Sequence, residues 1–217
     1  MNIRTPKLAF ALYLLAGFTS AAKADIIIGN LPQQNDIGGS FFGNFTLSKG
    51  LGFTMTKSID LTTAVLRLES LRTAHAPGIH LMSHSNAGLG VPNAILATFQ
   101  IPTMGLGIAN YVFTLPTPYR LQAGTTYWLV AAANSTTTGL NWLGSGPPVT
   151  PTGTYATYFG ERYDQDGFPP TGLSPAINSF QLTGNPITAP VPEPSAVVAL
   201  SAVGLLVFTR SRRRISA

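Results

Sequence analysis

The chain has 217 residues, contains no cysteine and carries a formal net charge of +5. This charge belongs to the two ends, because between Asp25 and Pro190 acidic residues slightly outnumber basic ones. The central part therefore lacks the basic patch of a nucleic-acid-binding protein. Without cysteine there are no disulfides and no zinc or iron–sulfur sites built on cysteine. The basic residues of the two ends are Arg4, Lys7, Lys23, Arg210, Arg212, Arg213 and Arg214.

The N-terminal segment has the three parts of a secretory signal peptide. Arg4 and Lys7 form a positive start, residues 8–18 are apolar, and Ala22 and Ala24 have the small-x-small spacing of a cleavage site. We predict that residues 1–24 are a signal peptide, removed by signal peptidase after export. The mature chain then begins at Asp25.

The body, residues 25–185, contains short β-type segments separated by Gly, Pro, Asn and Ser. In residues 59–71, Leu66 and Leu68 alternate with Arg67 and Glu69, which predicts a strand with one buried face. Residues 125–133 are apolar on both faces, as in a central strand. We predict the remaining strands at 25–28, within 38–53, and at 78–84, 95–101, 111–115 (ended by Pro116 and Pro118), 141–143, 155–159 and 178–183.

About eight to ten such strands without an internal helix predict an all-β fold. We expect an antiparallel β-sandwich, jelly-roll-like, as the ectodomain. It would be flanked by the signal peptide and by a single C-terminal hydrophobic helix. We expect five residues to be buried in it: Leu66, Leu68, Phe99, Tyr127 and Leu129.

An acidic segment near the end of the body is the best candidate for a metal site. Glu161, Asp164 and Asp166 precede Gly167, and oxygen ligands at alternating positions before a glycine can hold Ca²⁺. A polar loop without ligand explains the same residues, and paired carboxylates are also what a glycoside hydrolase needs. We expect no cofactor, with Ca²⁺ on Asp164 and Asp166 as the one candidate.

Aromatic residues surround the same segment. Tyr158, Tyr163 and Phe168 could stack on sugar rings, although core packing explains aromatic residues on strands equally well. His80 and His84 would share one face of a strand at a separation of about 13 Å, too far apart to hold one metal ion. We expect both histidines to face solvent.

The C-terminal segment holds three signals in a fixed order. After a linker at 186–191, Pro192 and Pro194 keep Glu193 in an extended peptide with Val191 before it. Residues 195–208 form an uncharged apolar run of about 14 residues, shorter than the roughly 20 that span a bilayer comfortably. Four arginines, Arg210, Arg212, Arg213 and Arg214, follow as a stop to translocation.

Residues 191–217 resemble the PEP-CTERM sorting signal of Gram-negative bacteria, in the order VPEP, hydrophobic helix and arginine-rich tail. The resemblance implies that an exosortase, a membrane protease, recognises the signal and removes the hydrophobic tail. It also implies association with extracellular polysaccharide. The body, over residues 55–185, resembles the choice-of-anchor R type of surface domain, which carries no catalytic residues to transfer.

Together these features predict an exported, non-enzymatic protein of the cell surface or extracellular matrix. The expected partners are signal peptidase and the export machinery, an exosortase-type processing enzyme, and extracellular polysaccharide, with no nucleic acid. The C-terminal helix would hold the chain transiently in the inner membrane of a Gram-negative bacterium. The alternatives are a secreted polysaccharide hydrolase or lyase, or a calcium- or sugar-binding module that uses residues 160–168.

Overall fold

The computed structural model describes residues 24–32, 35–36, 38–42, 47–71, 77–85, 90–133, 139–165, 168–173 and 177–187. The chain divides into two compact units, 1–186 and 187–217, and nearly all described residues belong to the first. The predicted C-terminal helix and most of the predicted signal peptide lie outside the described residues. Within them, no helix is long and apolar enough to cross a membrane.

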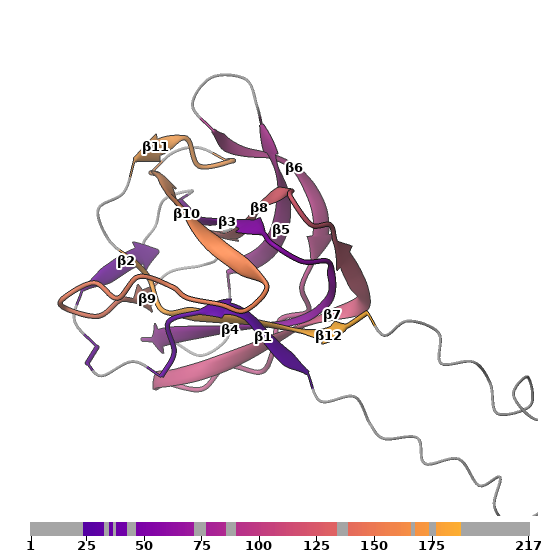
Figure 1. Cartoon of the computed structure of the whole chain (residues 1–217). Coiled ribbons are helices and arrows are strands. Elements are labelled where there is room, and N and C mark those ends of the chain that lie inside the picture. Colours follow the sequence, from indigo (N-terminus) through magenta and orange to yellow (C-terminus); the bar gives the residue numbers. More distant parts are fainter. Residues whose placement is uncertain are drawn as a thin grey trace, which may run out of the picture. The chain divides into compact units, whose positions relative to one another are not determined.

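The described part of the chain is all-β, as predicted, and its strands form two antiparallel sheets (Figure 1). The first sheet has the order β1-β12-β4-β9-β2, with β7 also paired to β4, and the second has the order β11-β10-β3-β8-β5-β6. The strands are β1 (Asp25–Gly29), β2 (Gly39–Phe42), β3 (Ser48–Met55), β4 (Ile59–Ser70), β5 (Gly78–Ser85), β6 (Val91–Thr98), β7 (Gly107–Leu121), β8 (Thr126–Ala132), β9 (Leu140–Leu143), β10 (Ala156–Asp164), β11 (Gly172–Leu173) and β12 (Phe180–Pro186).

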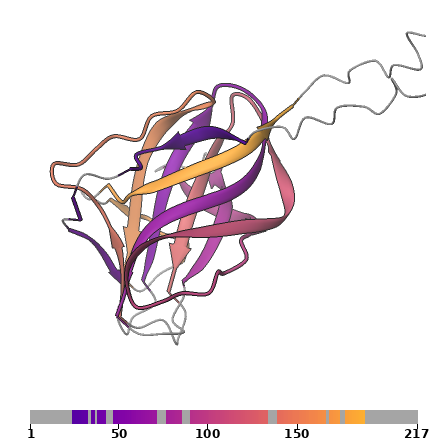
Figure 2. The same ribbon diagram turned by 90° about the horizontal axis from the view of Figure 1, so that it is seen from below.

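Strand β4 pairs with three other strands of the first sheet. Strand β7 pairs with it on one side, with one interruption at residues 115–118, while β12 and then β9 pair on the other. Its alternation is the predicted one, because Leu66 and Leu68 are buried while Arg67 and Glu69 bind neighbouring side chains. Strands β1 and β12 are antiparallel neighbours, and Figure 2 shows them side by side, in indigo and yellow.

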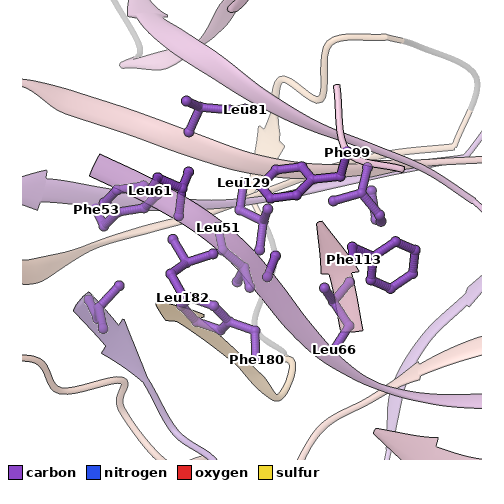
Figure 3. Close-up of a cluster of buried hydrophobic side chains, with 14 of the residues drawn as sticks. Leu51, Phe53, Leu61, Leu66, Leu81, Phe99, Phe113, Leu129, Phe180 and Leu182 are labelled. Atoms are coloured by element: carbon purple, nitrogen blue, oxygen red, sulfur yellow. The ribbon is translucent and has the colours of Figure 1, made fainter. Parts of the chain in front are cut away.

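The apolar faces of the two sheets meet in one core. Figure 3 shows Leu66, Phe113 and Phe180 from the first sheet together with Leu51 and Leu129 from the second. The five residues predicted to be buried, Leu66, Leu68, Phe99, Tyr127 and Leu129, are all buried in this core. Strand β8 lies between β3 and β5 and is buried on both faces, as its sequence predicts.

The chain crosses from one sheet to the other beside β1. Thr152 forms a bridge with Gly29, and the Tyr155 amide donates to the Ile27 carbonyl before the chain enters β10. The Tyr155 hydroxyl also donates to the Asp25 carboxylate over 2.6 Å. These contacts fasten strand β1 to the segment that leads into the second sheet.

Two predicted features of the strands are wrong. Strand β7 continues through Pro116 and Pro118 to Leu121, because residues 115–118 lie where its pairing with β4 is interrupted, so the prolines replace no ladder hydrogen bond. The register shifts between Leu61 and Thr63 of its partner at this point. Period-two alternation in the predicted strand 95–101 also places Ile95, Phe99 and Ile101 on one buried face. In the structure Phe99 is buried but Ile95 and Ile101 are half exposed, because the β5–β6 register shifts at Met82 and β6 ends at Thr98.

Neighbouring residues of β7 give a test of which face packs on the core. Phe113 is fully buried and Val112 is 49% exposed. Phe113→Ala should lower the free energy of unfolding by about 3–5 kcal/mol, because it leaves a cavity. Val112→Ala should change it by less than about 0.5 kcal/mol. Urea denaturation of both variants measures this, and equal losses would contradict the assigned faces.

Candidate functional site

Strand β10 carries most of the body's candidate residues for binding metal or sugar. It runs to Asp164, so Glu161 and Asp164 lie on a strand where we predicted a loop. Its pairing with β3 shifts between Tyr158 and Gly160, and Gly160 has a φ of 150°, in the region that favours glycine. Because of this irregularity both Tyr158 and Glu161 face the core.

Glu161 is paired inside the protein with Lys49. Nζ of Lys49 contacts Oε2 of Glu161, and the two side chains are 0% and 2% exposed. The Tyr158 hydroxyl donates to the other carboxylate oxygen, Oε1, over 3.0 Å. Glu161 lies opposite Leu51 and Lys49 opposite Tyr163, so the pair crosses diagonally between β10 and β3.

Burial governs the protonation of this triad. It lowers the pKa of the Lys49 ammonium and raises the pKa of the Glu161 carboxyl, while the attraction between the two groups acts in the opposite direction. Burial, and then the neighbouring Glu161, also raise the pKa of Tyr158. The tyrosine therefore stays protonated and remains a donor to the carboxyl group.

The predicted acidic cluster is divided by the strand. Glu161 points to the core, whereas Asp164 accepts a hydrogen bond from the Thr171 hydroxyl over 3.2 Å. Asp166 lies outside the described residues, so calcium binding by Asp164 and Asp166 stays a prediction. Among the residues that the structure describes, no three His, Asp or Glu side chains are grouped so as to hold a metal ion.

The outer face of the second sheet carries a separate group of rings, which we call the outer aromatic cluster: Trp128, His84 and Phe159. The indole of Trp128 is fully buried, and its Nε1 donates to Nδ1 of His84 over 3.1 Å. Since an indole N–H can only donate, Nδ1 is the acceptor and the ring proton of His84 lies on Nε2. Phe159 packs edge-on against both rings, at centroid distances of 5.7 and 5.0 Å, and is 46% exposed.

Two glycines make room for this indole. Gly50 and Gly52 of β3 face outward, and a Cβ on Gly52 would come within 3.0 Å of both Trp128 and Phe159. A side chain at either position would meet the indole where it lies across β3. The Arg162 guanidinium lies 5.8 Å from the Trp128 ring, within the range of a cation–π contact.

The three residues predicted to bind sugar do not form one platform. Tyr158 and Tyr163 pack against the core, whereas Phe168 contacts His80 on the outer face at a centroid distance of 5.7 Å. His80 and His84 share this face, as predicted. They are not simply solvent-facing, however, because each packs against an aromatic ring. Phe159, which is not among the residues predicted to bind sugar, is the exposed ring beside them.

A polar depression of about 350 Å³ lies at the other sheet and is lined in part by Asp36 and Glu69. Neither carboxylate is marked as a site residue by its sequence pattern. Arg67 donates to both oxygens of Asp36 and holds the pKa of that carboxyl below its usual value, and Asn141 donates to Glu69. Asp36 therefore stays ionised and does not have the raised pKa of a glycosidase acid.

The space that Gly52 leaves for the indole of Trp128 gives a second test of the structure. Gly52→Val should lower the free energy of unfolding by about 1–3 kcal/mol, because the new side chain overlaps Trp128. Gly105→Val is the control, since a Cβ there meets nothing within 4 Å. Urea denaturation measures both variants, and a Gly52→Val protein as stable as the control would show that the indole does not lie across β3.

The comparisons with known proteins concern the C-terminal segment. Residues 190–214 match the family model described as the PEP-CTERM protein-sorting motif, and they include Val191, Pro192, Glu193 and Pro194. No curated protein and no solved structure matches the chain. The resemblance of residues 55–185 to the choice-of-anchor R type is not supported. The matched motif indicates an exported protein that is sorted by an exosortase. This sorting is associated with the membrane and directs the protein toward the cell surface.

Proposed function

We propose that the chain is a non-enzymatic protein of the bacterial cell surface or extracellular matrix, where it associates with extracellular polysaccharide. The observation that carries this proposal is the sorting motif at residues 190–214. Its host would be a Gram-negative bacterium. Its body, residues 25–185, would be a jelly-roll-like sandwich displayed outside the cell.

The chemistry of the sorting segment suits temporary retention. Pro192 and Pro194 fix an extended backbone around Glu193, which an enzyme groove can accept at a small cost in ordering. The apolar run at 195–208 is short for a bilayer, so its flanks must help to hold it, and the arginines after it stop translocation. Cleavage near Glu193 would then release the body.

The ends of the body agree with processing at both ends of the chain. Strand β1 begins at Asp25, the first residue after the predicted signal-peptide cleavage site. Asp25 lies opposite Gly184 of β12, near the start of the linker to the sorting segment. The two segments that would cross or enter the membrane thus leave the body from neighbouring strands.

A change at Glu193 tests the sorting proposal. Glu193→Ala should leave export intact but keep unprocessed protein in the inner membrane, because the processing enzyme loses its only charged recognition group in the Pro-Glu-Pro segment. Asp164→Ala, which removes an acidic residue of the body, is the control and should be processed normally. Cell fractionation and immunoblotting of the two variants measure this.

Replacing the arginines of the tail tests retention in the membrane separately from recognition by the processing enzyme. Replacement of Arg210, Arg212, Arg213 and Arg214 by serine should allow the tail to pass through the membrane. Unprocessed protein should then appear outside the inner membrane. If Glu193→Ala were processed and displayed like the unaltered protein, the segment would act only as a membrane anchor.

Sugar binding is a second candidate function, favoured by the exposed rings of the second sheet. Phe159 and Phe168 are each 46% exposed and stand beside His84 and His80. Flat apolar rings next to polar nitrogens suit the C–H face and the hydroxyls of a sugar. The surface is built on a sheet whose indole is locked by a hydrogen bond, so the rings are positioned before a ligand arrives.

Removing one exposed ring tests this candidate. Phe159→Ala should weaken binding to extracellular polysaccharide isolated from the host by about tenfold, because an aromatic contact of this kind is worth about 1 kcal/mol or more. Val112→Ala, which alters an equally exposed apolar residue on the first sheet, should bind normally. Co-sedimentation with the polymer measures binding. Release of oligosaccharides in the same assay would instead favour the hydrolase or lyase.

A further inference from the structure

The buried triad of Lys49, Glu161 and Tyr158 has no role in sorting or in sugar binding. An isolated ion pair is an expensive occupant of a core, because removing two charges from water costs more than their attraction often returns. This pair is almost completely buried, on two adjacent strands, in a chain that has no cysteine for a covalent cross-link. The amine and the carboxyl group of the triad are the two reactants of a condensation, and the Tyr158 hydroxyl is a hydrogen-bond donor beside them.

We propose that Lys49 and Glu161 condense after folding to form an amide bond between their side chains. The bond would link β3 to β10 and join residues 112 positions apart. One molecule of water is released for each bond, and neither an oxidant nor a cofactor is needed. The site is thus a self-modification site within the core of the body.

The step begins with a neutral amine and a protonated carboxylic acid. Nζ of Lys49 attacks Cδ of Glu161, whose oxygen Oε2 lies against it. The electrons of the C=O bond move to Oε1, where the Tyr158 hydroxyl donates a hydrogen bond to the developing negative charge. A proton passes from the nitrogen to Oε2, which leaves as water, and the amide carbonyl re-forms at Oε1.

The environment favours each part of this step. Burial shifts the lysine pKa down and the glutamate pKa up, toward the two neutral forms that react. The fold holds the amine against the carboxyl group, which replaces a bimolecular encounter by an intramolecular one. The Tyr158 pKa is raised, so the phenol keeps the proton that it donates to Oε1.

Peptide mapping of the unaltered mature protein tests the proposal directly. Trypsin does not cleave after a lysine whose side chain is an amide, so residues 25–57 should be recovered covalently joined to residues 121–162. The joined species should weigh less than the sum of its two peptides by the mass of one water. Recovery of residues 25–49 and 50–57 as separate peptides, with 121–162 unlinked, would overturn the proposal.

Two variants assign the roles. Glu161→Ala retains Lys49 and should restore cleavage after it, which shows that the protection comes from the bond and not from poor access in the denatured digest. Tyr158→Phe keeps the packed ring and should slow bond formation by about 100-fold or more. Linking of Tyr158→Phe at the rate of the unaltered protein would overturn the role of the hydroxyl. If Glu161→Ala does not fold, the map of the unaltered protein still decides the proposal.

Discussion

The antiparallel pairing of β1 with β12 is the constraint on which the first sheet depends. Together these two strands bring the beginning and the end of the body onto the central strand β4. The sheet is complete only when Phe180–Pro186 has joined it, after almost the whole body has been exported. In the proposed sorting, the segment that follows this strand would hold the chain at the membrane while the last pairing forms.

The two faces of strand β10 carry different sets of side chains, one toward the core and one toward solvent. Toward the core it carries Glu161, which reaches Lys49, and toward solvent it carries Phe159 and Arg162, which cover Trp128. The irregular pairing at Gly160 separates these sets and sends Glu161 inward. The proposed amide bond on the inner face would anchor the strand that presents the outer rings. It would give the body a covalent cross-link, which a domain without cysteine cannot obtain from a disulfide.

Alternation in the sequence predicted the strands and much of the core. Leu66 and Leu68 and the apolar β8 behave as the pattern indicates, because a regular strand turns successive side chains to opposite faces. Pattern reasoning failed where pairing is irregular, at Gly160 and along β6, because a register shift moves side chains to the other face.

The candidate site could be predicted only in part. The sorting segment depends on local residue order and was predicted from the sequence, whereas the pairing of Lys49 with Glu161 joins positions far apart in the chain. Two signals pointed to what was missed. Lys49 is the one charged residue of strand β3, and the alternating Gly50 and Gly52 indicate the close approach of another group, which is Trp128.

We propose that the chain is processed at both ends on its way to the cell surface. Sequencing of both termini of the protein recovered from the cell surface or the medium tests it most directly. We expect an N-terminus at Asp25 and a C-terminus near Glu193, without the apolar run at 195–208 and the arginines that follow it. Surface protein that still ends at Ala217 would contradict it.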